Sequence, residues 1–515
     1  MSEQPDIVII GSGMGGATLA AGLAGSGARI VILERGEAIV DTPQARDARA
    51  IFIDKHFRTT ERWQVGKRRV RPSHYYCVGG NTKFYGAILI RYRREDFGEK
   101  QHFTGTSPAW PFSYETFEPW YSAAETLYAV RGTLDEDPTE PYHSIPYPHP
   151  PVPDEPDIAR FRAELRGVGL HPASLPLGID IDAWLQRGQD PWDAFPDTTG
   201  GKMDAQTRGL ATALADSLIS LETGARVDRL EVSPDGRRVA AVHYRQHGET
   251  KVLRPGLVVL SAGAINSAAI LLRSGAIANS SDQVGRNYMN HNGAMMLVID
   301  PRRRNRAVYQ KTIHVNDFYF GDGANPRPLG NFQMVGKVSA PMLASATGYV
   351  PRGILSAVAQ RSIDCFAMSE DLPDPESRVH VRGSDIALDW KRTNLPALTH
   401  LLTALKERLR ACGYPIIFTQ RYTEENSGHQ CGTVRMGNDP AKAPLDPYCR
   451  AYDQPNLFVV DASFLPNSAA VNPSLTVAAQ ALRVADHIRK TDLGGTYNDA
   501  MLAPTQAMPK FLPNT

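Results

Sequence analysis

The chain has 515 residues, of which 42% are hydrophobic, so it is long enough to bury a large core spread over about two to four domains. Lys and Arg number 56 against 55 Asp and Glu, a net charge of +1. This balance excludes a protein-wide field that would attract nucleic acid or anionic lipid.

The first residues of the sequence bear on where the protein is located, and the cysteines bear on whether it has disulfides or a zinc site. Residues 6–10 form a short apolar run that leads straight into Gly11, without the basic start and longer apolar stretch of a secretory signal. No apolar run is long enough to span a bilayer. No CxxC pair occurs among the scattered cysteines, which favours neither a disulfide framework nor a zinc site; they are Cys77, Cys365, Cys412, Cys431 and Cys449. We therefore expect a soluble cytoplasmic protein without a metal site.

Residues 6–34 carry the pattern of a dinucleotide-binding unit. A β-branched strand at 6–10 runs into Gly11-Ser12-Gly13-Met14-Gly15-Gly16, an alanine-rich helix follows, and a second strand ends at Glu34. Gly11 permits the tight turn, Gly13 lets the backbone approach a pyrophosphate, and Gly16 lets helix and strand pack closely. The helix N-terminus offers free N–H groups to phosphates. Glu34 suits the two ribose hydroxyls and would repel a 2′-phosphate, which disfavours NADP; this segment alone does not separate FAD from NAD.

The middle of the chain predicts a β-meander and two loops. Residues 221–260 are β-rich and contain the turn Pro234-Asp235-Gly236, which predicts a meander feeding a buried strand before Ser261. Residues 141–156 are rich in proline, and residues 347–353 are punctuated by glycine and proline. Each is interpreted as a surface loop, with a lid or a subunit contact as the alternative.

The last third predicts a strand and a helix that meet at a ligand. A buried strand beginning at residue 456 ends at Asp461, and a helix follows Asn472-Pro473 to about residue 489. Pro473 fits the first helical turn, where its missing N–H costs nothing. Asn472 lies at the cap position, so it can face a ligand on the helix end.

Three C-terminal strings, taken together, carry a family resemblance. They are His429-Gln430-Cys431-Gly432-Thr433-Val434-Arg435-Met436-Gly437, Val459-Val460-Asp461-Ala462-Ser463 and Val471-Asn472-Pro473-Ser474-Leu475-Thr476. They closely resemble the C-terminal signature of the glucose–methanol–choline (GMC) flavoproteins, which include pyranose oxidases, bacterial glycoside oxidases, sugar dehydrogenases and cholesterol oxidases. Residues 76–87 resemble the family's glycine-rich stretch near the flavin ring and pyrophosphate, and residues 258–267 its strand and turn back into the nucleotide domain. The pyranose oxidase and bacterial glycoside oxidase branch is the nearest.

The resemblance implies an α/β fold with two domains built from separated pieces. A Rossmann-like FAD-binding domain comprises residues 1–100, 205–297 and 426–490. A substrate-binding domain, a β-sheet with helices, comprises residues 101–204 and 298–425. Residues 491–515 are expected to form a tail.

The resemblance also implies FAD as the cofactor. The expected FAD contacts are Gly11, Gly13, Met14, Gly16, Glu34, Arg35, Gly79, Gly80, Asn81, Thr82, Phe84, Tyr85, Gly86, Ala87, Val227, Ala262, Gly263, Asp461, Ala462, Asn472, Pro473 and Thr476. Family members with a histidyl-linked flavin carry His a few residues after the paired glycines, where this chain has Phe84. Non-covalent FAD is therefore predicted.

Alcohol oxidation needs a base that removes the hydroxyl proton while a hydride leaves the same carbon. Histidine suits this task, because its unperturbed pKa of roughly 6.5 leaves the neutral form available near neutral pH. In the family pattern a His stands at the position of His429, and a His or Asn at that of Asn472. His429 is thus interpreted as the base and Asn472 as the group that holds the substrate oxygen. The alternative is a satisfied buried histidine and a plain helix cap.

Two other histidines receive a structural interpretation. His291 lies in a segment that resembles one along the family's domain junction, and His74 lies in a polar stretch that predicts exposure. A serine hydrolase is excluded because no GxSxG elbow lies between a strand and a helix.

The substrate is predicted to be a sugar or glycoside whose secondary ring hydroxyl becomes a ketone. Gln333, Tyr319 and Trp390 are candidates for its pocket because polar and aromatic side chains suit a sugar. Three alternatives stay open: an aliphatic, aromatic or sterol alcohol as substrate, a non-catalytic protein that uses the nucleotide fold to bind a partner, and an NAD-dependent dehydrogenase. The electron acceptor, oxygen or another, and the oligomeric state are undetermined by the sequence.

Overall fold

The computed structural model describes residues 4–186, 193–275, 277–323, 326–348, 350–383, 385–425 and 428–494. Most of the predicted tail, residues 495–515, lies outside this part of the chain, as does Tyr349 of the predicted loop 347–353. Within these ranges no helix combines the length and apolarity needed to cross a membrane.

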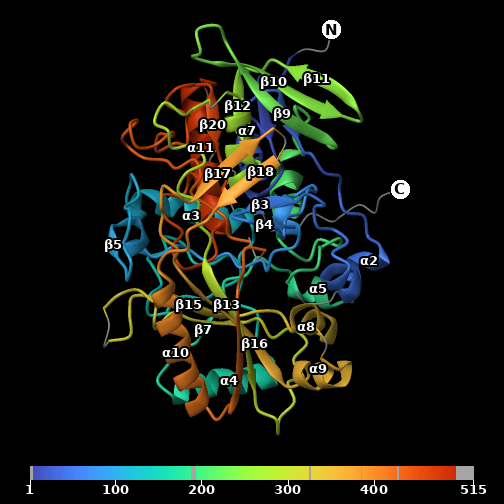
Figure 1. The fold of residues 1–515 in the computed structure, drawn as a ribbon, viewed down its shortest axis with the longest axis vertical. Coiled ribbons are helices and arrows are strands. Elements are labelled where there is room, and N and C mark those ends of the chain that lie inside the picture. The colour runs from blue at the N-terminus through green and yellow to red at the C-terminus, as the bar shows by residue number, and fades with distance from the viewer. Residues whose placement is uncertain are drawn as a thin grey trace.

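A parallel sheet occupies one end of the molecule, the top in Figure 1. Its strands, in spatial order, are β20 (Leu457–Val459), β12 (Leu257–Leu260), β1 (Ile7–Ile10), β2 (Ile30–Leu33) and β8 (Ile219–Glu222). Every neighbouring pair is parallel. All four residues of the central strand β1 are buried, as their unbroken β-branched run predicts for a strand covered on both faces.

Small residues bring two distant helices together over this sheet. Helix α1 (Met14–Leu23) packs against α11 (Ser474–Thr491), the C-terminal helix. A Cβ added at Gly22 of α1 would come 2.7 Å from the Cβ of Ala485 of α11. The alanine-rich composition of both helices thus allows an axis-to-axis approach that bulkier side chains would block.

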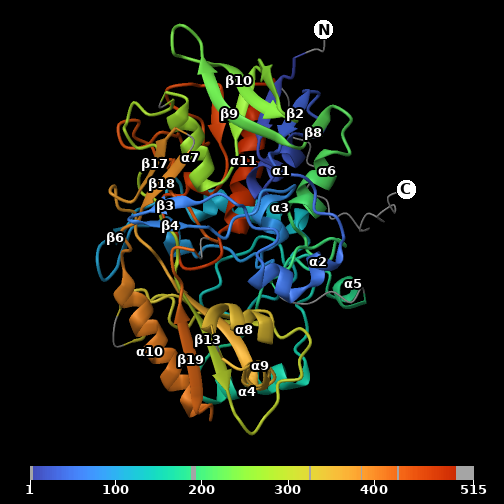
Figure 2. The same ribbon diagram turned by 45° about the vertical axis from the view of Figure 1, so that its right-hand side comes forward.

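The predicted meander is confirmed. Strands β9 (Ala225–Val232), β10 (Val239–Gln246) and β11 (Glu249–Leu253) form an antiparallel sheet, and β12 follows directly. Gly236 lies in the turn between β9 and β10 with a φ of 73°, a conformation that favours glycine. This sheet projects at the upper edge of the molecule in Figures 1 and 2.

An antiparallel sheet fills the opposite end. In spatial order its strands are β19 (Ile416–Arg421), β13 (Asn292–Ile299), β16 (Ser362–Ser369), β15 (Asn331–Met334), β14 (Ile313–Val315) and β7 (Ala173–Ser174). One face packs on α4 (Pro156–Gly167) and α10 (Leu395–Ala411), and the other on α8 (Ala340–Thr347) and α9 (Arg352–Ala359). Alternation along β16 separates the two cores: Ile363, Cys365 and Ala367 face one, and Phe366 and Met368 the other.

A third sheet and helix α3 (Tyr114–Leu127) lie between these two ends (Figure 2). The sheet has the order β17 (Arg378–Arg382), β18 (Asp385–Asp389), β3 (Trp63–Val65) and β4 (Arg68–Val70). The remaining short elements are α2 (Pro43–Arg46), α5 (Ile181–Gln186), α6 (Ala211–Ala213), β5 (Lys100–Gln101), β6 (Thr106–Ser107) and the single turns η1 (Arg49–Ile53), η2 (Gly80–Lys83), η3 (Arg94–Phe97), η4 (Ala205–Leu210) and η5 (Ala462–Phe464).

The fold is therefore α/β, with a Rossmann-like parallel sheet at one end and a helix-covered antiparallel sheet at the other. All five strands of the parallel sheet lie within the segments expected for the nucleotide domain. Strand β13 runs across the expected boundary at residue 297, and β18 pairs with β3 across the two expected domains. The division into domains at the expected residues stays a prediction.

Candidate active site

A cavity opens at the carboxyl end of the parallel sheet, where the glycine loop joins β1 to α1. Gly11 has a φ of 104°, and a Cβ there would lie 2.3 Å from the carbonyl oxygen of Ser261. A Cβ at Gly16 would lie 2.1 Å from the carbonyl oxygen of Gly11. Gly13 is different, because a Cβ there would meet nothing within 4 Å and the backbone is extended. Protein packing therefore requires Gly11 and Gly16, whereas Gly13 borders open space in the cavity.

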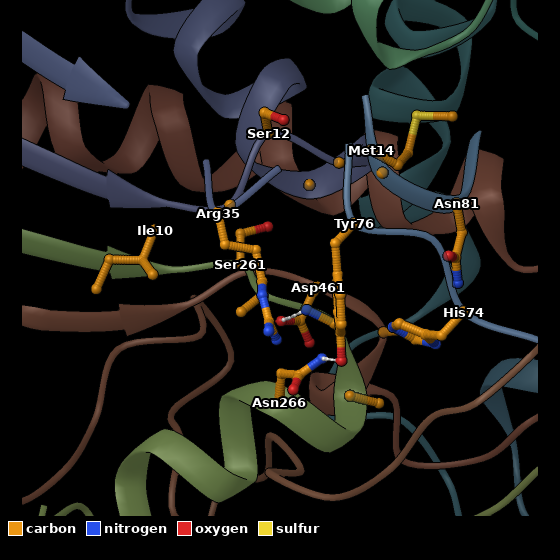
Figure 3. Close-up of a pocket in the computed structure, with 18 of the residues that line it drawn as sticks. Ile10, Ser12, Met14, Arg35, His74, Tyr76, Asn81, Ser261, Asn266 and Asp461 are labelled. Atoms are coloured by element: carbon orange, nitrogen blue, oxygen red, sulfur yellow. Dashed lines mark hydrogen bonds between the residues drawn. The ribbon is translucent and has the colours of Figure 1, made fainter. Parts of the chain in front are cut away.

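Three helix N-termini line this cavity. The residues preceding the helices are Gly13 for α1, Gly263 for α7 (Ala264–Arg273) and Pro473 for α11, and no side chain caps any of them. Uncapped N-termini present N–H groups and a partial positive charge, which together suit a pyrophosphate. Asp461, just after β20, accepts a 3.0 Å hydrogen bond from the Gly263 backbone N and so joins the end of β20 to the start of α7 (Figure 3).

The acid at the end of β2 is held by the glycine loop. Oε2 of Glu34 accepts hydrogen bonds from the backbone N and the Oγ of Ser12, at 3.1 and 2.7 Å, and Oε1 accepts one from Gly36 N at 3.0 Å. Burial raises the pKa of Glu34. Since a carboxylate has about four lone-pair sites, acceptor capacity remains for ribose hydroxyls.

An aromatic and cationic wall adjoins Glu34. The guanidinium of Arg35 lies 3.6 Å above the ring centroid of Tyr76 and forms a 2.7 Å ion pair with Glu61. Asn266 of α7 donates a 3.4 Å hydrogen bond to the Tyr76 hydroxyl, which fixes the ring across the cavity (Figure 3). The flat ring and the adjacent cation suit a planar heterocycle such as adenine.

The second glycine pair lies against the first glycine loop. Gly79, with a φ of 84°, donates from its backbone N to Ser12 Oγ at 3.1 Å, and a Cβ at Gly80 would lie 3.4 Å from the Cα of Gly13. Phe84 stacks on Tyr75, with centroids 3.7 Å apart, and is 5% exposed.

The structure brings most of the expected FAD contacts to this cavity. Its lining includes Gly11, Gly13, Met14, Glu34, Arg35, Gly80, Asn81, Thr82, Val227, Ala262, Gly263, Asp461, Ala462 and Pro473. Gly86 and Asn472 line a second, neighbouring cavity. Outside both linings lie Gly16, Gly79, Phe84, Tyr85, Ala87 and Thr476.

His429 is shared by the two cavities. It lines the nucleotide cavity together with Gly428, and both residues also line the second cavity. Nδ2 of Asn472 lies 3.3 Å from Nε2 of His429, so the two predicted residues are adjacent. Burial, and secondarily the nearby His291, lowers the pKa of His429 to about 3. The imidazole is therefore neutral at physiological pH, so one of its two ring nitrogens carries a lone pair in place of a hydrogen.

The second cavity combines polar groups with one apolar wall. It is lined by Gly86, Ile88, Asp193, Asn290, His291, Lys311, Gln333, Val335, Phe366, Tyr422, Gly428, His429 and Asn472. Its space is about 180 Å³, below the roughly 300–1,000 Å³ of pockets for drug-sized ligands. It is therefore suited to a small molecule or to one unit of a larger one.

Only one of the three expected pocket residues lines this cavity. Gln333 of β15 does so, opposite Phe366 of β16. Tyr319 lies outside it, donating to Asp96 Oδ2 at 2.8 Å and accepting from Ala470 N at 3.2 Å. Trp390 is also outside and donates from Nε1 to Asp371 at 3.0 Å.

The structure adds residues that the sequence interpretation missed. Lys311 and Asp193 form a 2.7 Å ion pair at the cavity wall, and His291 lies beside His429. The prediction that His74 is exposed is wrong, because it is 6% exposed and lines the nucleotide cavity; the surrounding polar residues do not reveal that it lies under that cavity. Within the described part of the chain, no group of three or more His, Cys, Asp or Glu side chains forms a metal site.

A dinucleotide would fit the glycine loop, the three helix N-termini and Glu34 at the end of β2. The neutral His429 between the two cavities would suit a flavin that lies beside an alcohol. The fold and the site thus define an FAD-dependent oxidoreductase.

Comparison with known proteins gives the family. Two family models described as GMC oxidoreductase match residues 186–293 and 392–481. The chain is 26% identical to 2-methyl-1,2-propanediol dehydrogenase of Mycolicibacterium austroafricanum over 95% of its own length and 96% of the relative's. It is 28% identical to 6'''-hydroxyparomomycin C oxidase of Streptomyces lividus over 94% and 92% of the two chains. The structure of pyridoxine 4-oxidase from Mesorbium loti has the same fold, with a TM-score of 0.66 at 20% identity over 94% of this chain and 99% of that one.

The chain belongs to the GMC oxidoreductase family. It is an enzyme that oxidises CH–OH donors with FAD as cofactor, as predicted. The non-catalytic and NAD-dependent alternatives are thereby excluded.

We expect FAD to leave the chain on denaturation. Phe84 stands where the family resemblance places the histidine of members with a covalently linked flavin, and its ring is stacked on Tyr75. Acid or heat precipitation of the purified protein should release all of its flavin into the supernatant, as measured by absorbance. Yellow colour that stays with the precipitated chain would contradict non-covalent binding.

Proposed function

We propose that this enzyme oxidises a secondary hydroxyl of a sugar or glycoside to a ketone, with His429 as the base and Asn472 holding the reacting oxygen. The observation that carries the proposal is the place of His429 at the junction of a nucleotide cavity and a small polar cavity, with Asn472 at 3.3 Å. Bound FAD supplies the hydride acceptor. The neutral imidazole takes the hydroxyl proton, and the amide of Asn472 orients the oxygen.

Unpaired acceptors in the cavity support a substrate with several hydroxyls. Asn472 Oδ1 and Gln333 Oε1 are buried and have no hydrogen-bond partner among the described residues. A buried acceptor left unpaired costs about 1–3 kcal/mol, so a ligand that donates to both would bind selectively. Hydroxyl groups supply such donors, and the wall made by Ile88, Val335 and Phe366 suits the C–H face of a sugar ring.

The ion pair of Lys311 and Asp193 adds groups that recognise hydroxyls. Lys311 Nζ also donates to the carbonyl oxygen of Gly86 at 2.5 Å, and its side chain is fully buried. Because the charges neutralise one another, the cavity favours a neutral polyol over an anion or a cation. One ammonium and one carboxylate together can donate to and accept from hydroxyls of the same ring.

The second candidate is a small non-sugar alcohol. The relative from Mycolicibacterium austroafricanum is named for a branched diol, and part of the cavity wall is apolar. The relative from Streptomyces lividus, named for an aminoglycoside, favours the sugar. The two candidate functions share the proton transfer to His429 and differ only in which part of the substrate fills the rest of the cavity.

Anaerobic mixing with a substrate panel tests the proposal. Sugars and glycosides are expected to bleach the flavin faster than diols, simple alcohols or sterols, and Gln333→Leu is expected to weaken sugar binding about 10-fold, since one hydrogen bond is lost. The measurement is the rate of flavin reduction against substrate concentration. Fastest reduction by a non-sugar alcohol, with no effect of Gln333→Leu, would reject the sugar.

The rate of flavin reduction is expected to be constant between about pH 5 and pH 8. His429 has a pKa lowered to about 3, so its proton-accepting form is fully populated over this range. A histidine with the ordinary pKa of roughly 6.5 would be mostly protonated at pH 5, and the rate would fall about 30-fold. Stopped-flow measurements across the range distinguish the two results.

A further inference from the structure

A short antiparallel pairing places a second histidine against the proposed base. Met289 and Cys431 form an isolated antiparallel bridge, with backbone N–O distances of 3.0 and 2.9 Å. Because the pairing is antiparallel, His291, two residues after Met289, lies opposite His429, two residues before Cys431. Their Nδ1 atoms are 2.8 Å apart, and the rings meet edge to face at 80°.

The backbone decides which nitrogen of His291 carries its proton. Nε2 of His291 lies 2.8 Å from the carbonyl oxygen of Ser468. A carbonyl oxygen only accepts, so Nε2 must donate and therefore carries the hydrogen. Burial lowers the pKa of His291, so the ring is neutral and its Nδ1 is a bare acceptor.

The same logic extends to His429. Since Nδ1 of His291 accepts, Nδ1 of His429 must be the donor across the 2.8 Å contact. A neutral His429 carries only that one ring hydrogen, which leaves its Nε2 bare. The amide Nδ2 of Asn472, 3.3 Å away, is oriented to donate to this nitrogen. The hydrogen bonds therefore run in one direction: Asn472 donates to His429, His429 donates to His291, and His291 donates to the carbonyl oxygen of Ser468.

We propose that His291 is a positioning residue that holds His429 as the tautomer protonated on Nδ1. Nε2 then keeps its lone pair, which the Asn472 amide faces in this structure and which takes the substrate proton once a hydroxyl displaces that contact. This inference rests on the proposed role of His429 as the base. The other tautomer would put a hydrogen on Nε2, where it would block proton transfer from the hydroxyl.

The surrounding hydrogen bonds hold both histidines in place. Oδ1 of Asn290 accepts from the backbone N of His429 at 3.2 Å, and the backbone N of Asn290 donates to Asp371 at 3.2 Å. Ser468 Oγ accepts from the backbone N of Asp371 at 3.1 Å and donates to its carbonyl oxygen at 2.9 Å. The acceptor that orients His291 is therefore itself anchored.

Two substitutions of His291 distinguish control of the His429 tautomer from a purely structural role in packing. In His291→Asn, Oδ1 takes the place of Nδ1 and still accepts from His429, although the bond to Ser468 is lost. In His291→Gln, the longer amide reaches Ser468 but leaves no acceptor at the position of Nδ1. Tautomer control predicts that flavin reduction at saturating substrate slows about 100-fold in the Gln variant and less than about 10-fold in the Asn variant. A purely structural role predicts that the larger Gln is tolerated at least as well as Asn.

Nitrogen NMR of the histidine-labelled holoenzyme tests the tautomer without turnover. The His429 signals, identified by their loss in His429→Ala, are expected to show a protonated Nδ1 and a bare Nε2 in the wild type and in His291→Asn, but not in His291→Gln. A protonated Nε2 in the wild type, or equal rates in the two variants, would overturn the inference. If a variant loses its FAD, the wild-type spectrum decides alone. Failure of His429 as the base would appear separately, as normal flavin reduction in His429→Ala.

Discussion

Replacing His429 with alanine is expected to leave FAD bound and to slow anaerobic flavin reduction about 10²- to 10⁴-fold, the usual contribution of a general base. The backbone N of His429 bonds to Asn290 and the segment is paired through Cys431, so removal of the imidazole leaves the local chain in place. The cofactor cavity is lined mainly by other residues. The measurement is the rate constant for flavin bleaching at saturating substrate.

Two controls sharpen this experiment. His171→Ala removes an imidazole whose side chain is 63% exposed and paired with Asp317, and it should leave the rate unchanged. Added imidazole should restore part of the rate in His429→Ala, because the substitution leaves a space beside Asn472. A rate within about threefold of the wild type in His429→Ala would remove this residue as the base.

Gly13→Val is expected to abolish FAD binding while the chain still folds. The backbone at Gly13 is extended and nothing lies within 4 Å of the position a Cβ would take, so the Cβ of the new residue meets no protein atom. Its side chain instead fills the space where the pyrophosphate approaches the start of α1. We expect Kd for FAD to rise at least about 100-fold, or about 2.7 kcal/mol, as measured by titration of the apoprotein.

Two other glycines serve as controls. Gly353→Val lies in α9 at an exposed position where an added Cβ also meets nothing within 4 Å, so FAD content should be normal. Gly16→Val would instead drive Cβ to 2.1 Å from the Gly11 carbonyl oxygen, and we expect that variant to misfold. A Gly13→Val protein that keeps its full flavin content would show that the pyrophosphate does not pass this residue.

Much of the nucleotide site could be predicted because its parts are local. Gly11, Gly16 and Glu34 lie on consecutive elements, and parallel strands bring their carboxyl ends to one edge of a sheet. That the distant C-terminal segments lie at the same edge of the sheet could be predicted only from their resemblance to the family. Of the three proposed substrate contacts, Gln333 lines the cavity, whereas the hydroxyl of Tyr319 and the indole N–H of Trp390 are bonded to Asp96 and Asp371. Polarity and aromaticity alone do not tell which way a side chain points.

By itself, the amino-acid sequence determined that this protein binds a dinucleotide at a glycine loop, because turn, helix end and acid follow one another within about 30 residues. It also set the two residues, His429 and Asn472, that the family pattern assigns to the chemistry. Only the tertiary structure decided that His291 bonds to His429. The two residues are 138 positions apart, and no sequence periodicity indicates the register in which their segments pair. The ion pair of Lys311 and Asp193 arose in the same way, because two segments distant in sequence fold against one cavity.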